Sequence, residues 1–309
     1  MGKFIVKRLL FMIPVIIAVT LAIFILSFLA AGDAARILAE KKYEHPSVTQ
    51  VEEVRHEQGL DRPILIQYAD WLNHVLHGDF GNSYSTGKPA IDELCRCFPQ
   101  TAKLALTALV LLIIIGIPLG ILSAVMENTA VDHVIQGFAF FSVSMPSFWL
   151  GLMLLFFFGV KLRVISVIGG SAAGIPIFAA FALDIGNFGL LIRLVRVNVI
   201  HVMKQDYIRA SRAKGLSTGK VIMKHAVKNS IIPVMTRMVG MIISLFCGSA
   251  VIESIFSING IGKLALESVV TKDSPVLQCF IFFLSVGVVV INLVVDILYS
   301  AIDRRIRLV

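Results

Sequence analysis

Six long apolar runs constrain this chain more than any other feature of its sequence. They lie at residues 9–31, 102–125, 134–160, 175–199, 234–256 and 276–300. A helix needs about 20 apolar residues to cross the hydrocarbon core of a bilayer, and each run is long enough. Of the 309 residues, 57% are hydrophobic and 16% are charged, whereas a soluble domain carries roughly 25% charged residues. The sequence therefore predicts an all-α, polytopic membrane protein with six transmembrane helices.

The first run has a competing interpretation as a removable signal peptide, because Lys3, Lys7 and Arg8 precede it. A signal peptide has an apolar core of roughly 7–15 residues that ends at a small-residue cleavage site. The run at residues 9–31 is longer, and no convincing site of this kind closes it. We therefore interpret it as the first span.

The distribution of basic residues predicts the orientation of the spans, because cytoplasmic segments are rich in lysine and arginine. The N-terminal tail, residues 204–228 and the C-terminal tail are all basic, whereas acidic residues outnumber basic ones in residues 33–96. We expect a multi-pass protein of a bacterial-type cytoplasmic (inner) membrane with both termini in the cytoplasm. Three parts follow: an N-terminal tail and first span at 1–31, an external helical segment at 32–100, and a five-helix membrane core at 101–309.

The external segment contains two stretches with helical periodicity, at residues 48–58 and 63–76. Pro46 and Ser47 are suited to starting the first helix, and Gly59 to ending it. His74 and His77 are three residues apart on one helical face, a spacing that suits a transition metal. Ordinary surface histidines are the favoured alternative, because no third ligand has a diagnostic spacing. The segment is predicted to form a small helical cap.

The loop at residues 203–233 reads as a basic helical hairpin on the cytoplasmic side. We expect one helix over residues 206–214, a break at Gly215, and a second helix capped by Ser217 or Thr218 that runs to about Asn229. Pro233 would then open the fifth span. One interpretation is an amphipathic helix lying on lipid headgroups, and the other is a docking element for a cytoplasmic protein.

The same loop carries a partial match to a phosphate-binding loop, at Gly215, Gly219 and Lys220. A P-loop has four residues between its glycines and a hydroxyl residue after the lysine. Here three residues separate the glycines, and Val221 follows the lysine. Valine does not bind magnesium, so direct nucleotide binding is not expected at this loop.

The order of several short motifs resembles ABC importer permeases of the dipeptide/oligopeptide/nickel family, and the likeness covers nearly the whole chain. The inner loop resembles the EAA loop of these permeases. The stretches that carry the resemblance are Phe4 to Leu10, Gly59 to Pro63, His77 to Ser83, Ser144 to Trp149, Asp206 to Leu216, His225 to Asn229, Ile231 to Pro233, Glu253 to Phe256, Gly260 to Gly262 and Asp273 to Gln278.

The resemblance implies that the inner loop couples this chain to a separate ATPase. It places that contact at Arg209, Ala210, Arg212, Lys214, Gly215, Leu216 and Ser217. ATP and magnesium would bind to partner subunits, and this chain would contain no cofactor and no catalytic residue. The implied partners are a sister permease, two P-loop ATPase subunits, an external substrate-binding protein and the lipid bilayer, with no nucleic acid.

Two positions depart from the family pattern. Arg209 stands where the broader EAA pattern has glutamate, although other residues are common there in this branch. Asn259 replaces the proline expected before Gly260, and the chain there loses the constraint that proline would impose.

Four residues are candidates for the translocation path: Met145, Asp184, Asn187 and Glu253. Polar residues within apolar runs usually face a protein interior or a water-filled path. Met145 and Pro146 indicate a kink in the third span. Two roles for Glu253 stay open, attraction of a cation or amine in the path and capping of a helix through hydrogen bonds.

The substrate is expected to be nickel, as ion or chelate, or short peptides. The chain's short length and the stretches at residues 144–149 and 275–279 tilt this expectation slightly to nickel. An autonomous secondary transporter is the alternative function, although the inverted repeats frequent in that class are not evident. A membrane enzyme is a weaker alternative, because no hydrolase or metalloprotease motif occurs.

Overall fold

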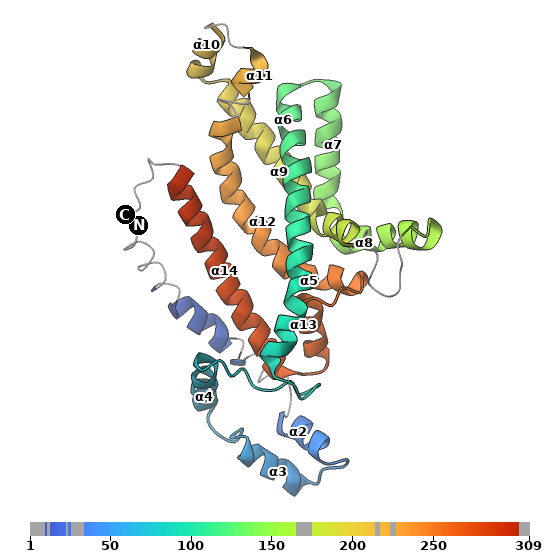
Figure 1. Ribbon diagram of the computed structural model, residues 1–309, viewed down its shortest axis with the longest axis vertical. Helices are drawn as coiled ribbons and strands as arrows, with labels where there is room; N and C mark the ends of the chain where they lie inside the picture. Colours follow the sequence, from blue (N-terminus) through green and yellow to red (C-terminus); the bar gives the residue numbers. More distant parts are fainter. Residues whose placement is uncertain are drawn as a thin grey trace. The chain divides into compact units, whose positions relative to one another are not determined.

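The computed structural model describes residues 10, 13–22, 24–25, 34–164, 175–213, 217–222 and 227–302 of the chain. Throughout these residues the regular structure is helical, apart from a single isolated bridge between Asn82 and Pro89. The predicted all-α fold class is confirmed. Figure 1 shows the helices in the order in which they follow along the chain.

Three helices are long and apolar enough to cross a membrane, at Ala90–Val125, Pro176–Met203 and Ser274–Val294. Two bent pairs would raise the number to five, at Ala130–Ser144 with Ser147–Lys161 and at Pro233–Phe246 with Gly248–Ile255. The first predicted run appears as a shorter apolar helix at Ile13–Ala22, and the rest of that run lies largely outside the described residues. The described residues thus give three to five spans, and the six-span prediction is not confirmed.

The second predicted span begins earlier than the hydropathy indicated. Helices α5 (Ala90–Leu111) and α6 (Ile117–Val125) join through a π-helical turn at Leu112–Gly116. Asp92, Glu93 and Arg96 lower the hydropathy of the first turns, so the apolar run starts only at residue 102. Pro99 lies inside α5 without ending it.

The third predicted span is broken instead of gently kinked. Helix α7 (Ala130–Ser144) and helix α8 (Ser147–Leu154), which continues in a π-helical turn at Leu155–Lys161, meet at an angle of 102°. Met145 adopts an extended conformation between them, with φ −86° and ψ 124°. A residue before proline is disfavoured in the helical region, which explains why the helix ends here.

The chain divides into two compact units. The first contains residues 1–99 and 263–293, and the second contains residues 100–262 and 294–308. The predicted division at residues 31 and 100 stays a prediction.

The first unit contains the helices of the predicted cap. They are α2 (Ala34–Lys42), α3 (Val48–Glu57) and α4 (Ile64–Leu76). Ser47 begins α3 with a capping box, because its side chain accepts from the N–H of Gln50 while the Gln50 side chain accepts from the N–H of Ser47. Gly59 follows α3 with φ +64°, a backbone conformation that glycine adopts without strain. Both predicted helices are confirmed, and α2 was not predicted.

The first unit also holds α14 (Ser274–Ile302) through its residues up to 293, together with most of α13 (Ile261–Val270). Asp273, just before α14, is 2% exposed. Its carboxylate accepts hydrogen bonds from the Ser83 hydroxyl at 2.5 Å and from the N–H groups of Tyr84 and Ser85 at 3.0 Å each. Phe80 packs against Phe282 and Phe283 on α14. These contacts hold the glycine-rich loop after α4 against the start of α14.

The second unit is built around α9 (Ile175–Met203), which contacts α6, α7, α8 and α12 (Lys228–Ile255). Figure 1 shows α6 and α7 running alongside α9. Phe188, Leu191 and Ile192 of α9 are fully buried. Small residues permit this close packing, because a Cβ on Gly120 of α6 would lie 2.6 Å from a Val195 side-chain carbon.

Candidate functional site

The predicted coupling loop forms two short helices that share an apolar anchor. Helix α10 (Asp206–Ala213) follows α9 directly, and α11 (Thr218–Val221) contacts α10. Ile208 of α10 and Val221 of α11 are both completely buried in the core around α9 and α12. The apolar side of the hairpin is therefore fixed to the second unit.

The other side of this hairpin is exposed. Arg209, Ala210 and Ser217 are exposed, and the Arg209 guanidinium lies 3.7 Å from the Asp206 carboxylate. Arg212 lies in the last turn of α10. Lys214, Gly215 and Leu216 lie outside the described residues. An exposed polar face on a rigidly anchored helix is suited to contact with another protein.

The second helix of the loop was expected to run from residue 218 to about Asn229. Helix α11 covers Thr218–Val221 and α12 begins at Lys228, and residues 223–226 lie outside the described residues, so this helix stays a prediction. Pro233 lies inside α12, and the part of that helix that is apolar enough to cross a membrane begins at this residue, as predicted for the fifth span.

Two predicted path residues form one polar cluster between α9 and α12. Asp184 is fully buried, and its Oδ1 accepts from the Asn187 amide at 2.8 Å. That amide also lies 3.4 Å from the Ser244 hydroxyl on α12. The second Asp184 oxygen is buried and has no hydrogen-bond donor among the described residues. A buried polar atom without a partner is costly, so this carboxyl is a strong functional candidate.

Glu253 lies in a separate cluster near the end of α12. Its carboxylate is fully buried and accepts from the Thr101 hydroxyl at 2.6 Å. The Thr101 hydroxyl in turn accepts from the Ile261 N–H at 2.8 Å. Gly260 crosses so closely that a Cβ there would lie 2.3 Å from the Glu253 carboxyl carbon. This geometry suits the hydrogen-bonding role that the sequence left open for Glu253.

Met145, the remaining path candidate, lies at the break between α7 and α8 and is half-buried. No contact recorded among the described residues joins it to Asp184, Asn187 or Glu253. The structure therefore brings two of the four candidates together and places the other two elsewhere in the second unit.

A buried ion pair between α7 and α9 was not predicted. Asp132 is 1% exposed, and Arg196 donates to both of its oxygens, from Nε at 2.8 Å and from Nη2 at 2.6 Å. The Ser123 hydroxyl and the Asn128 N–H also donate to this carboxylate, at 2.5 Å and 3.0 Å. Arg196 lies in the same helix that leads into α10. The sequence feature that could have indicated this ion pair is the presence of charged residues at the ends of two apolar runs.

His74 and His77, the two candidate metal ligands, form hydrogen bonds with backbone carbonyl oxygens one turn earlier in the chain. Nδ1 of His74 lies 2.7 Å from the Asp70 carbonyl oxygen, and Nδ1 of His77 lies 2.8 Å from that of Asn73. Within the described part of the chain, no three His, Cys, Asp or Glu side chains gather in a way that would hold a metal ion.

Two family comparisons cover nearly the entire chain. Residues 116–308 match the family described as "Binding-protein-dependent transport system inner membrane component". Residues 1–105 match the family described as "Binding-prot-dependent transport system membrane comp, N-term".

Individual relatives match over the same length. The glutathione transport system permease protein GsiC of Salmonella typhi is 34% identical over 307 residues, which are 99% of each chain. The GsiC protein of Escherichia coli strain K12 is likewise 34% identical over 307 residues. Nothing in these relatives supports the expected tilt to nickel.

A solved structure shares the fold. It is described as an inward-facing conformation of the MetNI methionine ABC transporter. It has a TM-score of 0.60 and 19% sequence identity, and the match covers 69% of this chain and 97% of that chain.

Proposed function

Because the chain belongs to the family of binding-protein-dependent transport system inner membrane components, we propose that it forms, with a sister permease, a pathway for short peptides. The chain is a multi-pass inner-membrane permease subunit of an ABC importer, and it is not itself an ATPase. The observation that carries the peptide proposal is the end-to-end match to glutathione permeases, since glutathione is a tripeptide.

The proposed topology has six spans and cytoplasmic termini. The apolar runs and the basic inner segments support it. The segment at residues 32–100 would then lie outside, where a binding protein delivers the peptide. Met145, Asp184, Asn187 and Glu253 remain the proposed residues of the path and its supports.

The function is tested by reconstituting the chain in proteoliposomes with its sister permease, the two ATPases and the binding protein. We expect ATP-dependent uptake of a radiolabelled tripeptide that requires the binding protein. Uptake of nickel in preference to the tripeptide would overturn the proposed substrate. Uptake that proceeds without the ATPases would overturn the proposed coupling.

Coupling is proposed to run through the exposed residues Arg209 and Ala210 of α10 and through the loop that follows. The full set of proposed contact residues is Arg209, Ala210, Arg212, Lys214, Gly215, Leu216 and Ser217. A loop of this kind moves the spans only if it binds the open and closed states of the ATPase dimer differently. The burial of Ile208 and Val221 supports this role, because a fixed anchor passes such a movement on to α9 and α12.

The substitution Ala210→Arg tests this contact. Ala210 is exposed, so the isolated permease is expected to fold normally, whereas the larger side chain would prevent close docking. We expect co-purification of the ATPase to fall at least about tenfold, a factor that corresponds to ~1.4 kcal/mol. Ala69→Arg is the matched control, because Ala69 is an exposed alanine of α4 in the outer segment. Equal recovery of the ATPase with both variants would contradict the proposed contact.

A further inference from the structure

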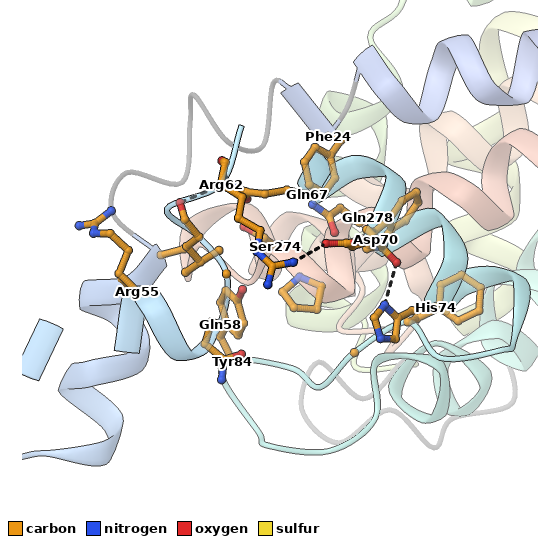
Figure 2. A pocket seen from close by; sticks show the side chains of 18 of the residues that line it. Phe24, Arg55, Gln58, Arg62, Gln67, Asp70, His74, Tyr84, Ser274 and Gln278 are labelled. Carbon is orange, nitrogen blue, oxygen red and sulfur yellow. Dashed lines mark hydrogen bonds and ion pairs between the residues drawn. The ribbon is translucent and has the colours of Figure 1, made fainter. Parts of the chain in front are cut away.

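The first unit contains a cavity of about 910 Å³ that the proposed transport role does not use. Its walls come from Phe24, the start of α2, the end of α3, helix α4 with the turn before it and the loop after it, and the start of α14 (Figure 2). Ligand pockets for small molecules usually measure roughly 300–1,000 Å³, so this cavity is large enough for a peptide of a few residues.

One wall of the cavity is aromatic and carries a buried donor without an acceptor. Trp71 stacks on Tyr68 with ring centres 5.9 Å apart, and Phe24 packs against both rings. Trp71 lines the cavity, and its indole Nε1 is buried with no hydrogen-bond partner among the described residues. Such a donor is costly in a folded protein unless an acceptor reaches it. Trp71 therefore marks a position suited to an acceptor from a bound molecule.

Arg62 supplies a second set of donors. Its Nη1 donates to Asp70 Oδ2 at 3.2 Å, and both side chains are more than half exposed. Figure 2 shows this pair among the residues that line the cavity, together with Gln67. The Gln67 amide donates to the carbonyl oxygens of Leu60 and Arg62, which fixes the backbone of the turn. An exposed pair contributes little stability, and a guanidinium has five N–H groups, so Arg62 has donors available for a carboxylate.

Carboxylates of the cavity offer the opposite charge. Glu57 is already paired with Lys42 at 3.1 Å, and Asp70 is shared with Arg62. Asp79 accepts from the Gly81 N–H through one oxygen. The Tyr84 phenol remains a neutral donor, because burial raises its pKa and the charge of Asp273 adds to the rise. A cavity with groups of both signs suits a ligand that also carries both charges.

We propose that this cavity is a second peptide site, which binds a short zwitterionic peptide outside the spans. The peptide carboxylate binds Arg62 and the Trp71 N–H, and the peptide ammonium binds Asp79 and Oδ1 of Asp70, whose Oδ2 accepts from Arg62. This inference rests on the proposed peptide function. A binding measurement on the permease alone can fail while uptake by the full transporter succeeds, so the two proposals are distinguishable.

The chain has two tryptophans, Trp71 and Trp149, which makes the test specific. The variant Trp149→Phe leaves Trp71 as the only tryptophan of the chain. The full-length variant in lipid nanodiscs is titrated with trialanine. We expect a saturable change in Trp71 emission, and about tenfold weaker binding of trialanine amide, which lacks the carboxylate.

Added in the same background, Arg62→Ala is expected to weaken trialanine binding at least about tenfold. Arg36→Ala is the matched control, because Arg36 is an exposed arginine of α2 that pairs with Glu40. Trp71→Phe, measured by calorimetry, removes the N–H and keeps an aromatic ring, so weaker binding there reports the hydrogen bond. No saturable response to trialanine, or equal binding by the Arg62 and Arg36 variants, would overturn the proposal. A response to the purified binding protein alone would instead make the cavity a docking surface.

Discussion

Replacing Asp132 by alanine is expected to lower the free energy of unfolding by about 3 kcal/mol, because a charge buried among helices would lose its counter-charge. The carboxylate is 1% exposed and accepts from four donors on three residues, Arg196, Ser123 and Asn128. This value is at the lower end of the cost of removing one partner from a buried ion pair. The reason is that 21% of the Arg196 side chain is exposed, so part of its charge is solvated.

The measurement is the unfolding midpoint of the purified chain in detergent, read by circular dichroism against denaturant. Glu127→Ala is the control. Glu127 lies just after α6, its carboxylate is 3.7 Å from the Lys204 ammonium, and both side chains are exposed. Removal of such a pair is expected to change the stability by less than about 1 kcal/mol. If the two variants shift the unfolding midpoint equally, the buried ion pair does not stabilise this fold more than an exposed pair does.

The ion pair between Asp132 and Arg196 could not be predicted from the sequence. The residues are 64 positions apart, and each lies at an end of an apolar run. Their burial and their pairing depend on how α7 packs against α9, which the hydropathy of single runs does not report. The same holds for Gly116 at the end of the π-helical turn and for Gly120 of α6, because their close contacts with α9 do not follow from the hydropathy of one run.

Signals that depend on a few neighbouring residues predicted the ends of helices better than hydropathy predicted the contacts between helices. The capping box at Ser47 and the left-handed glycine at position 59 place the ends of α3 within one residue. Both signals act through backbone geometry that a few neighbouring residues determine. The break at Met145 was predicted as a kink, but its size of 102° was not, because proline indicates where a helix can end and not the direction of the next helix.

Among the candidate site residues, the exposed positions could be predicted from the sequence better than the contacts of the buried ones. The sequence predicted a helical hairpin within residues 203–233, and the resemblance placed the ATPase contact at positions between 209 and 217. Arg209 and Ala210 are exposed, and the contact itself stays a prediction. The partner of each buried polar residue could not be predicted. Thr101, which bonds to Glu253, is 152 positions away and lies at the start of an apolar run that offered no polar pattern.

The substitution Gly189→Ala is expected to disrupt the packing of α7 on α9. A Cβ at this position would lie 2.2 Å from the carbonyl oxygen of Ala139 and 2.4 Å from the Ser142 hydroxyl. The first contact is with backbone, so no side-chain rotation relieves it, and the two helices must separate. Overpacking of this kind typically costs about 1–3 kcal/mol. We place Gly189→Ala at the upper end of that range.

Gly186→Ala is a control one turn earlier in the same helix, where a Cβ would meet nothing within 4 Å. There the substitution is expected to stabilise the helix by up to about 1 kcal/mol, because alanine favours a helix more than glycine does. The two variants carry the same chemical change in one helix, so their opposite shifts in the unfolding midpoint would isolate the contact with α7. Stabilisation by both would mean that α7 and α9 are not in close contact at Gly189, and the tightly packed core of the second unit would have to be revised.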